Sequence, residues 1–160
     1  MFTTVSPTAR WWLIALLIAW AVLLFGGFIV GKPNPEGTRR MTLWGRLGSS
    51  FVLVVAAWSW YWFGHSSSIA TPLFWIALGM TLGWIGDMFM AKIIPIKEPV
   101  IGGMSAFGLG HVAYIIGFML WGAKLAISNA GERWIALIVW LIFGALGWYF
   151  IVWRGQKTSI

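Results

Sequence analysis

The chain has 160 residues, of which 60% are hydrophobic and 9% are charged. A soluble domain usually carries about 25% charged residues, so water is not the main solvent of this chain. Cysteine is absent, which excludes disulfide scaffolds, Cys-ligated zinc or iron–sulfur sites and cysteine nucleophiles. The formal charge of +7 does not indicate nucleic-acid binding, because the basic residues occupy short connections between apolar runs.

Five segments are apolar and long enough to cross a hydrocarbon core of ~30 Å, which takes about 20 helical residues. They are residues 11–30, 44–63, 72–94, 100–121 and 134–153. Many of the 14 tryptophans lie near the ends of these segments, where an amphipathic ring favours the membrane interface. The sequence therefore predicts an all-α integral membrane protein. We expect a multi-pass bundle, one transmembrane domain over residues 1–160, of the kind found in a bacterial plasma membrane.

The connections predict the orientation of these segments. The loop after the first segment, the loop after the third and the C-terminal tail together hold eight basic residues. These are Lys32, Arg39, Arg40, Arg46, Lys92, Lys97, Arg154 and Lys157. The other side holds three, Arg10, Lys124 and Arg133. Cytoplasmic connections carry an excess of Lys and Arg, so we expect the N-terminus outside and the C-terminus in the cytoplasm.

Asp87 is the acid that falls inside a predicted span, whereas Glu36, Glu98 and Glu132 fall in connections. A carboxylate at membrane depth costs several kcal/mol unless it is paired, wetted or protonated, so such residues are functional by default. The alternative is a residue at the helix end whose side chain reaches the interface. If the third segment ends near Ala91, Asp87 lies only ~6 Å from the interface.

His111 lies in the middle of the fourth segment, on a stripe that it shares with Phe107, Tyr114 and three glycines. Residues three and four apart share a helix face, and the third segment carries a matching stripe of glycines. Small residues let helix backbones approach closely in lipid, so we expect the two segments to pack through these stripes. The packing glycines are Gly83, Gly86, Gly103 and Gly110.

Asp87 and His111 are candidates for an acid–base pair. A short connection makes the third and fourth segments antiparallel neighbours, with the two residues offset by ~6 Å along the axes. Such an offset is within reach of two side chains or one bridging water, and the carboxylate would then orient the imidazole. The alternative for His111 and Tyr114 is hydrogen bonding between helices, which is common in membranes. Two histidines and one buried acid do not make a metal site.

Asp87, His111 and Tyr114 belong to one motif that extends over two consecutive segments. It begins with Gly86-Asp87 near the end of a span and continues, after a short loop, with Gly103, Ala106-Phe107, His111 and Tyr114. In order, spacing and placement in consecutive spans, the motif resembles the YhhN-type lysoplasmalogenase family of membrane proteins. The resemblance covers residues 72–121 well and the flanking segments more loosely.

The resemblance implies a membrane-embedded ether-lipid hydrolase that cleaves the vinyl ether bond of lysoplasmalogens. The products are a fatty aldehyde and a glycerophospho-ethanolamine or -choline. Asp87 would then be the proton donor or its orienting partner, His111 the other member of the pair, and Tyr114 a hydrogen-bonding support. Lys92 and Lys97 are candidates to hold the phosphate head group. The implied partners are membrane lipids and the lysophospholipid substrate, and the chemistry requires no nicotinamide, haem or metal.

Members of the family are longer, with about eight spans and another aspartate on a later helix. We therefore expect a short or C-terminally truncated member, which is a fragment, an inactive relative or a chain that completes its cavity as a homo-oligomer. Two other functions stay open, namely a small proton-coupled transporter in which Asp87 and His111 relay protons, and a non-catalytic lipid-binding subunit. Transporters often show internal repeats, which are not evident in this sequence.

Overall fold

Residues 6–33, 39–125 and 129–150 are described by a computed structural model of the chain. The elements are α1 (Pro7–Ile29), β1 (Lys32–Pro33), β2 (Arg39–Arg40), α2 (Leu43–Gly64), α3 (Ala70–Met90), α4 (Pro99–Leu125) and α5 (Ala130–Trp148). Each of the five helices is long and apolar enough to cross a membrane. This confirms the predicted all-α membrane fold. The two short strands pair antiparallel in the connection between α1 and α2, with Lys32 opposite Arg40.

All five helices begin earlier than predicted, and α1 and α5 begin four residues earlier because capping residues precede their apolar runs. The Ser6 hydroxyl accepts a hydrogen bond from the Ala9 amide at 3.2 Å, and Pro7 occupies the first position of α1, where its missing N–H costs nothing. Asn129 and Glu132 form a capping box at the start of α5, which satisfies two orphan amides. The end of the predicted fifth span, residues 151–153, lies outside the described residues.

α3 ends at Met90 instead of Ile94, and the reason is its C-terminal cap. The Lys92 amide donates to Phe89 O and the Ile93 amide to Met88 O, the bonding pattern of a Schellman motif. This pattern requires a left-handed residue, and Lys92 has φ 59°. Asp87 therefore lies only three residues from the end of its helix, as in the shorter of the two alternatives that the sequence left open.

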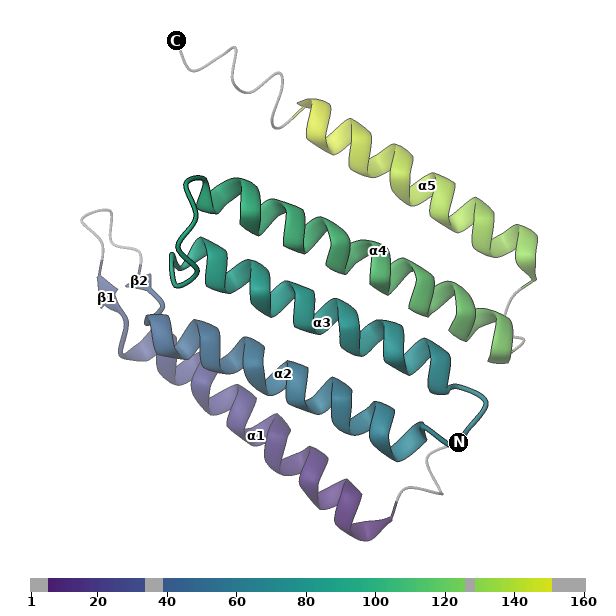
Figure 1. The fold of residues 1–160 in the computed structure, drawn as a ribbon, viewed down its shortest axis with the longest axis horizontal. Helices are drawn as coiled ribbons and strands as arrows, with labels where there is room; N and C mark the ends of the chain where they lie inside the picture. The colour runs from purple at the N-terminus through teal and green to yellow at the C-terminus, as the bar shows by residue number, and fades with distance from the viewer. Residues whose placement is uncertain (1–5, 34–38, 126–128, 151–160) are drawn as a thin grey trace. The chain divides into compact units, whose positions relative to one another are not determined.

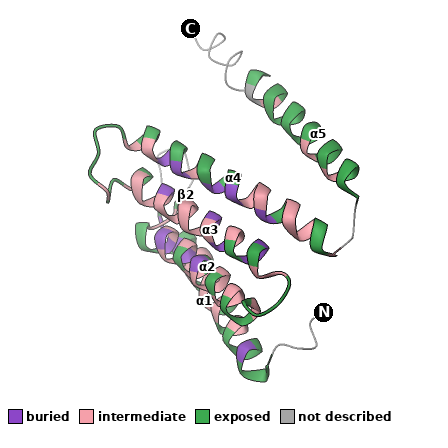
Figure 2. Ribbon diagram, turned by 45° about the vertical axis from the view of Figure 1, so that its right-hand side comes forward, coloured by how far each residue is buried: buried purple, intermediate pink, exposed green. Residues whose placement is uncertain are grey.

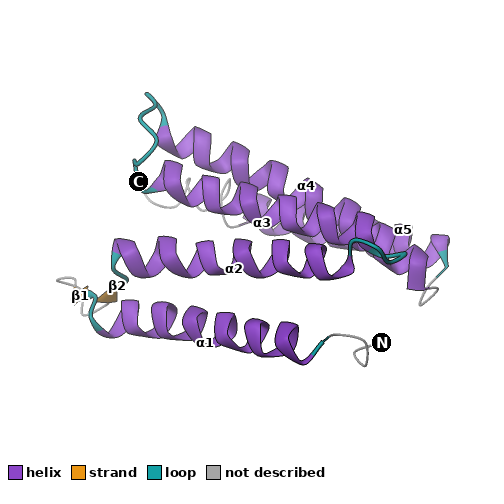
Figure 3. Cartoon of the chain, turned by 60° about the horizontal axis from the view of Figure 1, so that its bottom comes forward, coloured by secondary structure: helices purple, strands orange, loops and turns teal. Residues whose placement is uncertain are grey.

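The chain divides into two compact units, Met1–Leu120 and Trp121–Ile160. In the first unit, α1 to α4 lie side by side in chain order (Figures 1 and 3). Most buried residues where α3 meets α4 are small, whereas many large apolar residues of both helices are exposed, and Figure 2 shows the buried and exposed positions along each ribbon. The small ones are Gly79, Gly86, Gly103, Ala106, Gly110, Ala113 and Gly117. Close approach of small residues is typical of helix contacts in lipid.

Tryptophan side chains bond neighbouring helices to one another. The Trp12 indole of α1 donates to the Ser59 hydroxyl of α2 at 3.0 Å. The Trp84 indole of α3 donates to Leu47 O of α2 at 3.2 Å. Indole N–H groups need an acceptor when they leave water, so these bonds fix the register of adjacent helices. Trp12, expected only as an interface residue, thus also holds α1 against α2.

The orientation of the spans is open to a direct test. Because eight basic residues are predicted on one side and three on the other, a reporter fused after Ile160 is expected to read cytoplasmic. A reporter inserted at residues 64–71 is expected to read external. Alkaline phosphatase and fluorescent-protein fusions measure the two sides independently, and the reverse pattern would overturn the orientation.

Candidate functional site

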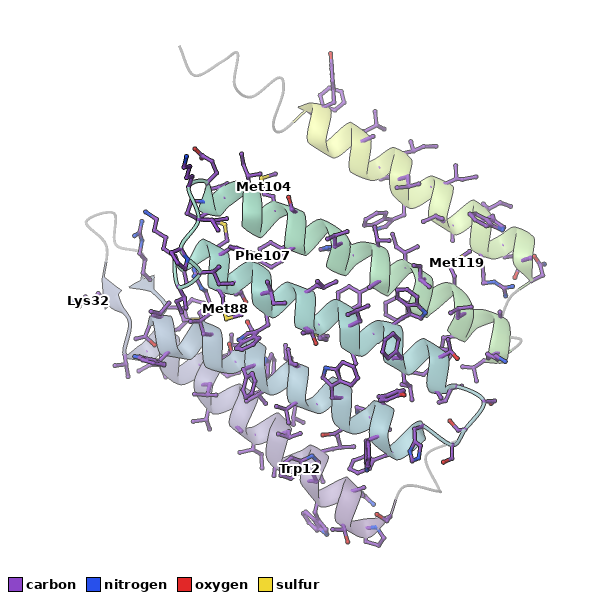
Figure 4. The ribbon with its side chains drawn as sticks, in the orientation of Figure 1. Trp12, Lys32, Met88, Met104, Phe107 and Met119 are labelled. Atoms are coloured by element: carbon purple, nitrogen blue, oxygen red, sulfur yellow. The ribbon has the colours of Figure 1, made fainter. Side chains whose placement is uncertain are left out.

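Glycines bring α3 and α4 into close contact next to the candidate site. A Cβ added to Gly86 would lie 2.8 Å from the Phe107 ring, and one added to Gly103 would lie 3.3 Å from Gly86 O. Phe107 accordingly lies between the two helices (Figure 4). A Cβ on Gly110 would lie 3.1 Å from Gly79 O. An added Cβ would crowd its neighbours at each of these positions, so the close contact favours glycine.

Gly83 differs from the other glycines that the sequence assigned to packing. A Cβ there would meet no described atom within 4 Å. The position lies one turn before Asp87 on α3, so it borders open space beside the carboxyl group. The contact at Gly110 fixes the axial register of α3 and α4. A Cβ on Gly110 would lie between Gly79 O and Gly83 N, at 3.1 and 3.5 Å. Gly110 is therefore level with about residue 81 of α3.

Asp87 is partly buried and is held by α2. The Ser50 hydroxyl donates a hydrogen bond to Asp87 Oδ2 at 2.5 Å. Within the described part of the chain, no basic side chain forms a salt bridge with this carboxyl group. Its place near the helix end does not make it a free surface residue, because it bonds across to the neighbouring helix.

The Ser50 hydroxyl can serve Asp87 in either protonation state. Its oxygen also lies 3.1 Å from Arg46 O of its own helix. A hydroxyl has one proton and two acceptor lone pairs. When Asp87 is ionised, Ser50 donates to the carboxylate. When Asp87 is protonated, the acid can donate to Ser50 and Ser50 to the Arg46 carbonyl. The arrangement therefore suits a carboxyl group that releases and regains a proton.

His111 is exposed on α4, with its ring fixed from two sides. Its Nδ1 lies 2.7 Å from Phe107 O, one turn earlier. A carbonyl oxygen only accepts hydrogen bonds, so Nδ1 carries the proton and the Nε2 of a neutral ring presents a lone pair. The Tyr114 ring meets the imidazole edge-on, with centroids 6.2 Å apart. Tyr114 thus supports His111 by a ring contact, and its own ring packs against Gly79.

Asp87 and His111 lie on the same face of the helix layer but are not directly bonded. Each follows a glycine at the contact, Gly86 or Gly110, and is rotated about 100° from it. Because α3 and α4 run antiparallel, the two rotations lead to one face. His111 is level with about residue 80 of α3, so the axial offset is ~10 Å, against ~6 Å expected. Each side chain has a different hydrogen-bond partner among the described residues.

The two lysines suggested for the head group, Lys92 and Lys97, lie in the connection between α3 and α4. Both are exposed, at the end of the helices where Asp87 also lies. Lys92 adopts a left-handed backbone conformation in which glycine is usual. A lysine at this position therefore carries a conformational cost. Neither lysine makes a described contact with Asp87 or His111.

Sequence reasoning missed Ser50 and Arg46, which belong to the same site. A signal was present, because α2 and α3 run antiparallel and Ser50 and Asp87 both lie within about 10 Å of the same helix ends. Serine in a span next to an intramembrane acid is a natural hydrogen-bond partner. Depth alone, however, does not say that Ser50 faces α3.

A separate apolar groove of about 760 Å³ lies between α1 and α2. Trp12, Val54, Trp58 and Trp62 are among its lining residues. Asp87 and its α4 neighbours do not line it. The groove is therefore distinct from the candidate site.

Five apolar helices, with a carboxyl group near a helix end and an imidazole at mid-helix on the same face, define a polytopic membrane protein with a polar site. A family model described as the YhhN family matches residues 45–158. The match covers more than half of the chain, so the chain belongs to the YhhN family, and the resemblance inferred from the sequence is confirmed. No curated protein and no solved structure gives a significant match.

Proposed function

We propose that this YhhN-family protein hydrolyses the vinyl ether bond of lysoplasmalogens, with Asp87 as proton donor and His111 as base. The family membership supports this reaction class. The observation that carries the assignment is the hydrogen bond from Ser50 to Asp87. It holds an acid on the same face as an imidazole, and among the described residues the acid has no ion pair and the imidazole Nε2 has no partner.

The depth of Asp87 suits this substrate. The vinyl ether bond of a lysoplasmalogen joins its hydrocarbon chain to glycerol, so it lies at the boundary between hydrocarbon and head groups. Asp87 lies three residues from the end of α3, about 5 Å along the axis. An acid at the middle of the bilayer would not reach this bond.

The first step is protonation of carbon. Asp87 transfers its proton to the carbon of the double bond that is not attached to oxygen, and the π electrons form the new C–H bond. An oxygen lone pair of the ether stabilises the resulting oxocarbenium ion. The Asp87 carboxylate formed in this step accepts the Ser50 hydrogen bond, which stabilises its charge as it develops.

The second step adds water and resets both groups. Water attacks the oxocarbenium carbon while His111 Nε2 takes a proton from it, which gives a hemiacetal. The protonated imidazole then returns this proton to the leaving glycerol oxygen as the C–O bond breaks. The Asp87 carboxylate takes the hydroxyl proton of the hemiacetal, which becomes the aldehyde. One water is consumed, and Asp87 and His111 return to their starting states.

The separation of Asp87 and His111 fits these roles better than a directly bonded pair. An acid and a base that act on a substrate together with a water molecule stand several ångströms apart, as in inverting glycosidases. The axial offset of ~10 Å, less the reach of both side chains, leaves room for a vinyl ether and one water. The open space at Gly83 lies between their levels.

The test is aldehyde release by the purified full-length chain in phospholipid vesicles. A 1-alkenyl lysophosphoethanolamine is expected to yield free aldehyde, whereas the 1-alkyl analogue is expected to be inert, because a saturated ether cannot be protonated on carbon. The 1-acyl analogue serves as a control for esterase activity. No release from the alkenyl lipid, or equal attack on the ester, would refute the proposal.

A further inference from the structure

We infer that Arg46 binds the phosphodiester of the substrate and so selects lysolipids that carry a phosphate head group. This inference rests on the proposed function and adds a binding residue to the same site. It is drawn from a cation one turn from Ser50 that has no partner among the described residues. Arg46 entered the sequence analysis only as one of the basic residues that set orientation.

The Arg46 side chain is partly buried, and its Nε has no hydrogen-bond partner in the described part of the chain although the atom is shielded from solvent. A buried donor without an acceptor costs about 1–3 kcal/mol, and more when the group is charged. No described carboxylate forms a salt bridge with this guanidinium group. The two terminal amino groups of the guanidinium have no described acceptor either, and they are not enclosed as Nε is. An anion from outside the chain is therefore expected to bind at these terminal groups.

The position of Arg46 matches the shape of a lysophospholipid. Arg46 precedes Ser50 by four residues on α2 and shares its face, about 6 Å nearer the helix end. In the substrate, five bonds separate the phosphorus from the ether oxygen, which spans about 6 Å when extended. A phosphate on Arg46 would thus place the vinyl ether level with Asp87.

Arginine suits this role better than Lys92 or Lys97. A guanidinium group presents a planar set of donors that binds phosphate oxygens in a bidentate manner, and it is less strongly hydrated than an ammonium group. Arg46 is partly buried on α2, one turn before the serine that bonds Asp87, whereas both lysines are exposed. We assign the specific contact to Arg46, with the lysines adding only to the general positive potential.

The same phosphate chemistry could come from the substrate or from an anionic bilayer lipid. The first measurement therefore compares the KM of wild type and Arg46→Gln for 1-alkenyl lysophosphoethanolamine and for phosphate-free 1-alkenyl glycerol. We expect KM to rise about tenfold or more for the phospholipid, the scale of one lost charge-assisted hydrogen bond, and to stay unchanged for the alkenyl glycerol. Arg46→Lys should recover part of the loss. Arg40→Gln removes an exposed charge near the same helix ends and should behave as wild type.

Repeating the measurement in zwitterionic vesicles and in vesicles with 30% phosphatidylglycerol separates the two sources. A substrate contact predicts the same Arg46→Gln defect in both. A defect confined to the anionic vesicles would assign Arg46 to bulk lipid and overturn the inference. An equal rise of KM in Arg40→Gln, or an equal defect with the alkenyl glycerol, would overturn it as well.

Binding of the inert 1-alkyl lysophosphoethanolamine separates this inference from the proposed function. Arg46→Gln should weaken that binding about tenfold relative to wild type, measured by equilibrium dialysis of radiolabelled lipid in micelles. Weakened binding with no aldehyde release from the alkenyl lipid would refute the hydrolase and leave the phosphate site standing. Equal binding by both proteins would refute the phosphate site alone.

Discussion

Asp87→Asn is expected to lower the kcat of aldehyde release by about 10² or more, the usual scale for a general acid–base group. Asparagine has the same shape and can still accept the Ser50 hydrogen bond through its amide oxygen, but it cannot donate a proton to carbon. Expression and membrane insertion should survive, because the change removes a charge that is costly in lipid. The measurement is steady-state hydrolysis of 1-alkenyl lysophosphoethanolamine.

His111→Ala is expected to give a loss of similar size, since no group would then take the proton from water. The double variant should be little worse than either single one, because members of one catalytic unit are not additive. Glu98→Gln is the matched control, since this acid is exposed in the connection before α4. It should retain wild-type kcat.

Full activity of Asp87→Asn would refute the assignment of Asp87 as proton donor and leave it as a structural partner of Ser50. Multiplicative losses in the double variant would mean that Asp87 and His111 contribute independently instead of as one catalytic unit. Either outcome is distinguishable from misfolding, because the yield of monodisperse protein reports folding independently of activity.

Gly110→Leu is expected to have the largest effect on folding. Its Cβ would lie 3.1 Å from a backbone oxygen, Gly79 O, which cannot move aside as a side chain can. Leucine adds three further carbons at this contact, so α3 and α4 must separate, at a cost of about 2–3 kcal/mol or complete loss of folded protein. Thermal unfolding in detergent measures the effect.

Gly108→Leu is the control on the same helix. Gly108 is exposed, and a Cβ there would meet no described atom within 4 Å. Both changes raise helix propensity equally, so the difference between them isolates the packing contact. If the two variants unfold at the same temperature, α3 and α4 do not depend on close approach at Gly110.

The sequence by itself determined the membrane class, the five helices and the family. These follow from properties that do not depend on which helices become neighbours. A span needs about 20 apolar residues whatever its partners are, and the motif from Gly86-Asp87 to Tyr114 is readable along the chain. Helix ends were less well predicted, because Ser6, Asn129 and the left-handed Lys92 act through local hydrogen bonds that hydropathy does not register.

Only the tertiary structure decided what surrounds each polar residue. The sequence places Asp87 and His111 in adjacent spans at similar depth, but it does not fix the rotation of each helix or the axial register. Both are set by contacts such as Gly110 against Gly79, which come from backbone approach. These contacts turn Asp87 toward Ser50 of α2 and leave His111 about 10 Å away along the axes. A pattern read along one helix cannot reveal a partner on another, because register is a property of the packed pair.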